Sequence, residues 1–327
     1  MTQPALSVRD LVVHYGRRRG TPPAINGVGF DIAPGETLGL VGESGSGKST
    51  IGKAILGLQA ASSGSITLNG TDITTASLRR RRVSAVHLRA VFQDPYSSLN
   101  PTLTIGQTLV EPLRVLRVPK QEQWLRARDA LEAVGLPADA IDRYPARLSG
   151  GQRQRVAIAR ALVCDPKVIV LDEPVSALDL STQAQVLNLL ADLRDQRQLA
   201  LLFIAHDLGV VRFLSQRVVV LYRGQVMEEG DAEAVTQDPR HPYTVALTAA
   251  APVPHPAQQA RRRAAREALG IGAAGTAAAA PAGCPFANRC PLAVDRCRTE
   301  RPPLTGTGHA SAACHRLDEA AALRASR

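Results

Sequence analysis

The sequence lacks both a long apolar run and an export signal. No apolar run reaches the roughly 18 residues that a membrane-spanning helix needs, and residues 1–5 show no basic segment followed by an apolar stretch. These absences predict a chain that neither spans a bilayer by itself nor is secreted. Lysine is also scarce, at four of the 39 basic residues, a bias that a GC-rich genome would produce without any functional cause.

What is present indicates a basic, globular, cytoplasmic protein. Apolar residues make up 45% and charged residues 21% of the 327 positions, a balance typical of folded chains. The length allows about two domains. The formal charge is +10, and residues 251–327 contribute +6 of it through 11 arginines against five acidic residues. Composition alone does not explain this charge.

The five cysteines are not arranged as in a secreted disulfide-bonded domain. Cys164 stands alone in an apolar stretch, which predicts a buried structural thiol. The other four lie between residues 284 and 314. Clustered thiols in a chain expected to remain in a reducing compartment indicate a metal or cluster site.

Hydrophobic patterning predicts a largely parallel sheet. The apolar runs at 168–171 and 199–205 show no alternation, so they predict strands buried on both faces. Other patterns predict a strand at 6–15 and two strands within 27–40, joined by a turn at Pro34-Gly35. They also predict a hairpin arm at 66–68 before Asn69-Gly70, a hairpin at 218–226, and helices at 50–58, 121–134, 151–163 and 181–196. After about residue 239 the composition shifts, and residues 249–280 are an Ala-rich helix or linker, two possibilities that the pattern leaves open.

A phosphate-binding loop is predicted at residues 42–49, Gly-Glu-Ser-Gly-Ser-Gly-Lys-Ser. The segment satisfies G-x-x-x-x-G-K-[ST] between a predicted strand and a predicted helix, the context that distinguishes a P-loop from an ordinary glycine-rich turn. Its glycines let backbone N–H groups point inward, and the helix N-terminus favours an anion. Lys48 would reach the β- and γ-phosphates, and the Ser49 hydroxyl would ligate Mg²⁺.

Two carboxylates, Asp172 and Glu173, follow the apolar run at 168–171. Ligands of open α/β sheets bind at the carboxyl ends of strands, so Asp172 is expected to hold the Mg²⁺ shell, directly or through water. Glu173 is expected to orient and deprotonate the attacking water as general base. Without the P-loop, the pair would equally suit a solvated turn.

The segment Leu148-Ser149-Gly150-Gly151-Gln152 precedes a predicted helix, between the P-loop and the two carboxylates. Such a helix start offers a second anion-binding site, although a simple helix cap would look the same. The segment resembles the signature motif of ATP-binding cassette (ABC) ATPases, in the family's order between Walker A and Walker B. The resemblance covers about residues 6–230.

The resemblance implies roles for further residues. Gln93 matches the Q-loop glutamine that contacts Mg²⁺ and water, Asp179 matches the D-loop, and His206 matches the switch histidine at the γ-phosphate. Tyr15 matches the aromatic residue that stacks on adenine, although packing alone would also explain a strand tyrosine. The implied catalytic residues are Lys48, Gln93, Glu173 and His206, and the implied Mg²⁺ ligands are Ser49, Gln93 and Asp172. The implied ATP-binding residues are Tyr15, Gly42, Ser44, Gly45, Gly47, Lys48, Ser49, Thr50, Gln93, Ser149, Gly150, Gly151, Gln152, Asp172 and Asp179.

The resemblance also implies the fold and the assembly. The expected fold is α/β: a RecA-like P-loop NTPase core with an antiparallel β subdomain and an α-helical subdomain at about 94–165. The expected domains are an ATPase at 1–235 and an extension at 236–327 that contains the four cysteines. ABC ATPase domains pair head to tail, with ATP between one P-loop and the partner's signature motif. This chain has one set of motifs, so it is expected to pair with itself or with a second ABC ATPase.

The C-terminal third narrows the resemblance to one group of transporters. Residues 238–244, Asp-Pro-Arg-His-Pro-Tyr-Thr, and the cysteine segment resemble the extension of oligopeptide and dipeptide importer ATPases, although His-Pro-Tyr alone would also suit a packed turn. Residues 92–101 are typical of the F-type subunit of this group. The resemblance implies two transmembrane permeases and an extracytoplasmic substrate-binding protein as partners, with the ATPase peripheral on the cytoplasmic face of the inner membrane.

The cysteine spacing C-x5-C-x6-C-x16-C lacks the paired C-x2-C knuckles usual in zinc ribbons. Four thiolates without knuckles suit a [4Fe–4S] cluster, and the segment resembles that of cluster-bearing importer subunits. An iron–sulfur cluster is the first expectation, with zinc or no metal as alternatives. The expected ligands are Cys284, Cys290, Cys297 and Cys314. The nearby arginines expected to offset thiolate charge are Arg289, Arg296 and Arg298.

The expected function is therefore ATP hydrolysis coupled to uptake of di- or oligopeptides, with nickel complexes and glutathione-like peptides as other substrates of the same group. The main alternative is a soluble ABC ATPase acting on nucleic acid, which would use the arginine runs at 17–19, 79–82 and 261–263. The sequence shows no tandem domain, coiled coil or large insertion that would support it, so no nucleic acid partner is expected. A nucleotide kinase or GTPase would not need the signature motif.

Overall fold

The computed structural model describes residues 3–16, 21–75, 84, 86–93, 98–250, 282–307 and 309–320. The three arginine runs, most of the Ala-rich segment and residues 94–97 lie outside these ranges. Across the described helices, none combines the length and the apolar character needed to cross a membrane.

An antiparallel sheet forms the N-terminal part of the fold, with strand order β2-β1-β4-β5. Its strands are β1 (Leu6–Val13), β2 (Ile25–Ile32), β4 (Ser63–Leu68) and β5 (Thr71–Asp72). Asn69 and Gly70 both adopt positive φ, 47° and 75°, which is the geometry that a two-residue hairpin turn requires. The hairpin arm predicted before Asn69-Gly70 is confirmed.

A second, eight-stranded sheet has the strand order β11-β12-β10-β9-β3-β8-β7-β6. From β9 to β6, neighbouring strands are parallel. These strands are β9 (Arg217–Tyr222), β3 (Thr37–Val41), β8 (Ala200–Ala205), β7 (Val168–Asp172) and β6 (Leu88–Val91). The two apolar runs form β7 and β8, and both are buried on both faces as predicted.

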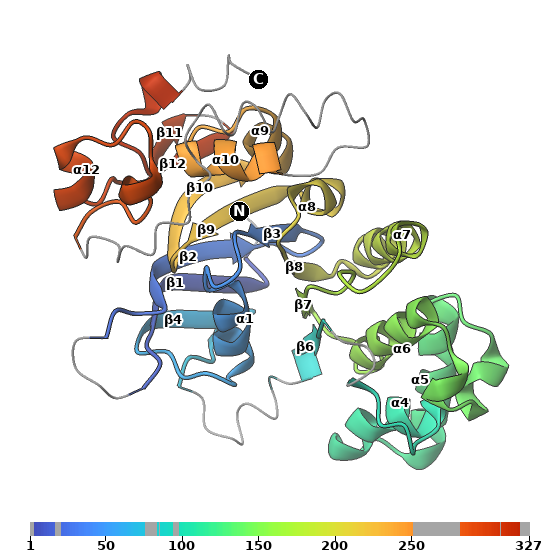
Figure 1. Ribbon diagram of the computed structural model, residues 1–327. Helices are drawn as coiled ribbons and strands as arrows, with labels where there is room; N and C mark the ends of the chain where they lie inside the picture. The colour runs from blue at the N-terminus through green and yellow to red at the C-terminus, as the bar shows by residue number, and fades with distance from the viewer. Residues whose placement is uncertain are drawn as a thin grey trace.

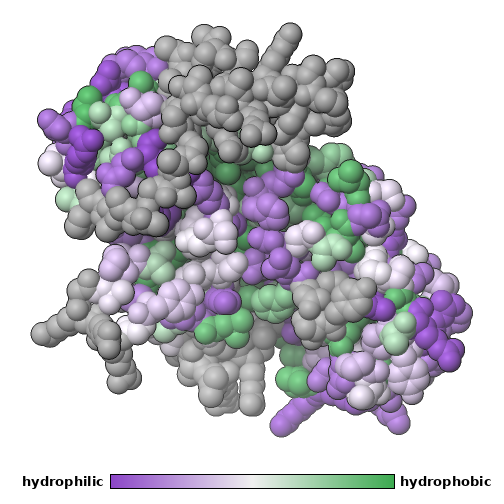
Figure 2. Space-filling model, viewed as in Figure 1, coloured by the Kyte–Doolittle hydropathy of each residue, from purple (hydrophilic) through white to green (hydrophobic). Residues whose placement is uncertain are grey.

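Six of the described helices fall into two groups. In Figure 1, α4, α5 and α6 form a lobe to one side of the sheets, beyond β6 and β7, whereas α8, α9 and α10 lie near β9 and β10. On the face shown in Figure 2, the side chains of this lobe are largely hydrophilic, with single apolar ones interspersed. The helices are α1 (Lys48–Leu56), α4 (Ile105–Val115), α5 (Lys120–Ala133), α6 (Gly150–Leu162), α7 (Leu180–Arg197), α8 (Leu208–Leu214), α9 (Ala232–Gln237) and α10 (Pro242–Ala250).

The cysteine-bearing extension continues the main sheet, which the sequence patterns did not predict. Strand β12 (Ala310–Ala312) pairs antiparallel with β10 (Gln225–Asp231), placing Ala312 opposite Glu228, and β11 (Thr305–Thr307) pairs with β12. Strands of three residues are too short to show alternation. The described residues between 282 and 304 also form η3 (Ala287–Arg289) and α12 (Asp295–Thr299). Phe286 from this segment is fully buried in the same hydrophobic core as Tyr243 and Val218, so the cysteine segment shares one core with the main sheet.

Candidate functional site

The P-loop at 42–49 leads from β3 into α1, as the strand and helix patterns predicted. Gly47 caps α1 with φ of 104°, and a Cβ at this position would lie 2.5 Å from Ile25 Cδ1. The position therefore needs glycine. Because glycine has no side chain to occupy them, the first N–H groups of α1 remain available to an anion.

The Lys48 ammonium is held inside this loop. Its Nζ donates hydrogen bonds to the carbonyl oxygens of Gly42 at 2.7 Å and Glu43 at 3.0 Å, and the residue is only 6% exposed. Burial lowers the pKa of Lys48, while the charges of Glu173, Asp172 and Glu43 act in the opposite direction. A phosphate group at the loop would provide the negative charge that this buried cation lacks in immediate contact.

A hydroxyl and a carboxylate meet where β7 ends beside α1. Ser49 Oγ donates to Asp172 Oδ1 at 3.0 Å. Burial raises the pKa of Asp172, Ser49 lowers it by its hydrogen bond, and the charge of Glu173 raises it further. A hydroxyl and a carboxylate are oxygen ligands of the kind that Mg²⁺ prefers, so the residues present fit this ion.

Glu173 and His206 lie together on the neighbouring strand ends. Glu173 Oε2 is 3.4 Å from His206 Nδ1, and both residues line a cavity of about 110 Å³ that also includes Gln183. Glu173 adopts φ of 49°, a left-handed conformation that is unusual for a non-glycine residue, and its N–H donates to Ile204 O at 2.9 Å. Its position is therefore fixed by β8 as well as by β7.

Two further predicted residues flank this edge of the sheet. Gln93 is exposed and follows β6 by two residues. Since Val91 of β6 pairs in parallel with Leu171 of β7, Gln93 lies at the same sheet edge as Asp172. Tyr15 is 51% exposed, and its hydroxyl is 2.9 Å from Thr50 Oγ1 of α1.

The signature residues lie apart from the P-loop in the single chain. Ser149 and Gln152 form a reciprocal capping box at the start of α6, and α6 belongs to the helical lobe, whereas α1 lies beside the antiparallel sheet (Figure 1). A Cβ at Gly151 would lie 2.3 Å from Thr182 Cγ2 at the start of α7. Asp179 caps α7 by accepting from the N–H and hydroxyl of Thr182 at 3.0 and 2.7 Å, and these bonds lower the pKa of Asp179 to about 2. The chain thus brings the signature and D-loop residues together, away from the phosphate loop.

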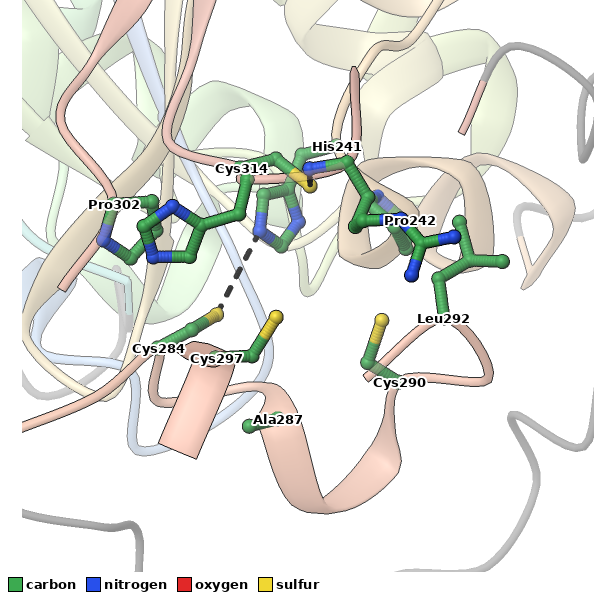
Figure 3. Close-up of a pocket in the computed structure, with 11 residues that line it drawn as sticks. His241, Pro242, Cys284, Ala287, Cys290, Leu292, Cys297, Pro302 and Cys314 are labelled. Atoms are coloured by element: carbon green, nitrogen blue, oxygen red, sulfur yellow. Dashed lines mark hydrogen bonds between the residues drawn. The ribbon is translucent and has the colours of Figure 1, made fainter. Parts of the chain in front are cut away.

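The four clustered cysteines line one cavity together with His241 (Figure 3). All are free thiols, and burial raises the pKa of Cys284 to about 11 and of Cys290 to about 12. His241 Nε2 is 4.0 Å from Cys284 Sγ. The fifth cysteine, Cys164, is 2% exposed and accepts a hydrogen bond from Arg89 at 2.7 Å, which fits the buried thiol that the sequence predicted.

The thiol cavity does not have the geometry of a formed metal site. It measures about 10 Å³, room for about one water molecule. No group of three or more His, Cys, Asp or Glu side chains in the described part of the chain is arranged to hold a metal ion. The described side-chain geometry thus supports neither the iron–sulfur expectation nor the zinc alternative.

The arginines expected beside the thiols instead bind carboxylates. Arg289 pairs with Glu43, Arg296 with Glu300, and Arg298 with Asp295, at 2.8, 2.7 and 3.3 Å. An ionised carboxylate accepts charge-assisted hydrogen bonds, which accounts for these three ion pairs. That the same arginines offset the charge of ligated thiolates stays a prediction.

Sequence analysis also missed two residues that contact the P-loop. The Tyr243 hydroxyl accepts a hydrogen bond from the Glu43 N–H at 2.8 Å, and Arg289 binds both carboxylate oxygens of Glu43. These contacts join residues 200 and 246 positions apart in the chain. No local pattern could indicate them, because helix and strand periodicities report only near neighbours.

Known proteins resemble this chain along nearly its whole length. Residues 25–176 match the family model "ABC transporter", and residues 227–297 match "Oligopeptide/dipeptide transporter, C-terminal region". A putative peptide import ATP-binding protein of Brucella ovis is 49% identical over 92% of this chain and 94% of its own. The oligopeptide transport ATP-binding protein OppF of Salmonella typhimurium is 42% identical over 96% of both chains.

The fold likewise resembles that of solved ATP-binding cassettes. A dimeric cassette in a post-hydrolysis state, bound to ADP and Pi, superposes with a TM-score of 0.62 at 29% identity, over 69% of this chain and 98% of the cassette. The predicted α/β fold with antiparallel and helical parts is confirmed by this likeness and by the two sheets described above. The chain is therefore an ATP-binding and ATP-hydrolysing protein of the ABC transporter family, in the branch that carries the oligopeptide/dipeptide transporter C-terminal region.

Proposed function

We propose that this chain hydrolyses ATP to drive the uptake of di- or oligopeptides through two transmembrane permeases. The names of its relatives, which include peptide import and oligopeptide transport ATP-binding proteins, support this substrate class. The observation that carries the proposal is the arrangement at the sheet edge, where the Ser49–Asp172 pair adjoins the Glu173–His206 pair. The first pair would bind the metal ion and the second would supply the general base, both beside the loop that would hold the phosphates.

Each residue at this edge has a separate role in the proposed mechanism. Lys48 and the N-terminus of α1 bind the phosphates. Ser49, Asp172 and Gln93 would hold Mg²⁺, which neutralises charge on the β- and γ-phosphates. Glu173 orients the attacking water and takes its proton. His206, which lies 3.4 Å from Glu173, would contact the γ-phosphate.

We propose that a second subunit completes the ATP site. Residues 149–152 cap a helix in the lobe that lies apart from α1, so a head-to-tail partner is needed to bring a signature motif to the P-loop. The solved cassette bound to ADP and Pi is itself dimeric. The similarity to OppF supports an F-type subunit, which would pair with itself or with a second ABC ATPase. Residues 1–235 and 236–327 are the proposed ATPase and extension.

The expected assembly lies on the cytoplasmic face of the inner membrane, beneath the permeases and supplied by an extracytoplasmic binding protein. We expect tagged chain from its native membranes to co-purify with two permeases and a second ATPase. Adding a peptide-loaded binding protein to the reconstituted complex should raise its ATPase rate, because binding energy on the outer face is transmitted to the ATP sites. Nickel complexes and glutathione-like peptides offered in the same assay would distinguish the substrate classes.

Two outcomes would contradict import. One is recovery of the chain without permeases. The other is a salt-sensitive shift of duplex DNA by the purified chain, which would favour the nucleic acid alternative because phosphate contacts weaken steeply with salt.

We also propose that the four clustered cysteines bind a [4Fe–4S] cluster, ahead of zinc. Four unpaired thiols from separate segments line one cavity, and four cysteine ligands are the usual complement of such a cluster. Binding would require the sulfurs to move outward from the small cavity described above and to lose their protons. This reorganisation is one that metal binding commonly drives.

Anaerobic purification followed by iron and acid-labile sulfide assays is expected to find about four of each per chain. Cys297→Ser is expected to lower both, whereas Cys164→Ser, in the core away from the cavity, should leave them unchanged. Zinc in place of iron would support the alternative metal. Colourless protein without iron or zinc, but with intact ATPase activity, would contradict a metal at this site.

A further inference from the structure

We propose that Arg289 is a positioning residue of the ATP site, which holds the P-loop through Glu43 and so makes the cysteine segment part of the nucleotide-binding structure. Arg289 ends the short helix η3, directly before Cys290. Its two terminal nitrogens donate to the two carboxylate oxygens of Glu43 at 2.8 and 3.0 Å. Two parallel bonds of this kind fix orientation as well as distance.

The guanidinium group of Arg289 is held in place on several sides. It lies 5.7 Å from the ring centroid of Tyr222 and 5.4 Å from that of Phe286, within the range of cation–π attraction. One nitrogen also lies 3.3 Å from the Tyr222 hydroxyl. The Arg289 side chain is 17% exposed. These contacts reduce the conformational entropy that an exposed arginine would lose on forming the same pair.

Glu43 connects this arginine to the catalytic lysine. The Glu43 carbonyl oxygen accepts a hydrogen bond from Lys48 Nζ at 3.0 Å and one from the Ser46 N–H at 3.1 Å. The Glu43 N–H donates to the Tyr243 hydroxyl at 2.8 Å. Arg289 of the cysteine segment therefore binds the side chain of Glu43, and Tyr243 of α10 binds its main chain. The carbonyl of the same residue orients Lys48.

The local fold of the cysteine segment determines where Arg289 lies. The N–H of Ala287 donates to Cys284 O at 3.0 Å, and the N–H of Cys290 donates to Ala287 O at 3.3 Å. Arg289 is thus carried on a short turn between two of the four thiols, and Phe286 anchors that turn in the core. Any rearrangement of this turn would move the guanidinium group relative to Glu43.

A different arginine of the same segment provides a matched comparison. Arg296 also forms two hydrogen bonds with a glutamate, Glu300, at 2.7 and 3.0 Å. That pair is exposed, with 63% and 53% of the two side chains accessible, and it lies within one helical turn of its own segment. It has the same chemistry as the Arg289–Glu43 pair, but Arg296 is paired with Glu300 of its own segment rather than with the P-loop.

The experiment measures binding of a non-hydrolysable ATP analogue with Mg²⁺ to the full-length chain by calorimetry. Arg289→Gln is expected to raise the Kd by about tenfold, the order of one lost charge-assisted contact, and Arg289→Lys to recover part of the loss, since lysine keeps the charge but not the fork. Arg296→Gln should bind as the wild type does. In the assembled ATPase, the KM for ATP should rise more than kcat falls.

A double-mutant cycle tests whether Arg289 acts through Glu43. If it does, Arg289→Gln combined with Glu43→Gln should bind no more weakly than either single variant. Losses that add, or wild-type affinity in a folded Arg289→Gln protein, would overturn the proposal. If Arg289→Gln lowers the Tm, a double variant that exchanges the two residues, Glu43→Arg with Arg289→Glu, tests the same contact. Nucleotide affinity that recovers in this variant supports the proposal. Affinity that stays low although the Tm is that of the wild type overturns it.

Discussion

Glu173→Gln is expected to lower steady-state ATP hydrolysis by roughly two to four orders of magnitude, the usual contribution of a general base, while ATP binding persists. Glutamine has nearly the shape of glutamate and can still orient a water molecule, but it cannot accept the proton. The residue is held at the sheet edge by its N–H bond to Ile204 and lies 3.4 Å from His206. The substitution should therefore leave the site's geometry in place.

Phosphate release by the assembled complex and nucleotide binding by the isolated chain would be measured together for this variant. Glu233→Gln is a suitable control, because this carboxylate pairs with Arg212 between α8 and α9 and does not line the Glu173 cavity. Turnover near the wild-type rate in the Glu173→Gln complex would show that another group takes the proton.

Lys48→Ala is expected to weaken nucleotide binding by about 100-fold or more, since in the proposed site the ammonium would make charge-assisted contacts with two phosphates. Burial lowers the pKa of Lys48, which means that the ammonium is already partly desolvated before a nucleotide binds. Removing the ammonium leaves the Gly42 and Glu43 carbonyls without this donor, but it leaves no charge buried. The variant is therefore expected to fold.

Nucleotide titration of the full-length chain, with circular dichroism to verify folding, would measure this effect. Lys120→Ala, at an exposed position that begins α5 in the helical lobe, should bind nucleotide normally. Wild-type affinity in folded Lys48→Ala would mean that the backbone N–H groups of the loop suffice, and the role assigned to Lys48 would fail. A parallel loss in Lys120→Ala would point to a general effect of charge instead.

Local patterns predicted the elements that carry the ATP site, because each depends on neighbouring residues. A positive φ requires glycine at position 47, and the reciprocal cap joins Ser149 and Gln152, which are only three positions apart. The runs that form β7 and β8 are apolar because both faces of a parallel strand are buried. Even the Asn69-Gly70 turn follows from the conformations available to two residues.

The arrangement of the extension could not be predicted in this way. Strand β12 joins β10 through a pairing between segments about 80 positions apart, as in Glu228 opposite Ala312. The partner of Arg289 was likewise not predictable from local patterns. Arg289 binds the carboxylate of Glu43 in the P-loop, 246 positions away in the sequence. Helix and strand periodicities cannot predict a contact over such a separation.

The sequence by itself predicted the chemistry that we propose for this protein: a phosphate loop, two carboxylates at the end of a strand and a signature motif, each encoded by a few adjacent residues. The tertiary structure alone decided what the C-terminal cysteines are attached to. It joins their segment to the main sheet and bonds Arg289 and Tyr243 to Glu43. The physical reason is that local conformation depends on near neighbours, whereas ion pairs and strand pairings between distant segments form only when packing of a shared core brings those segments together.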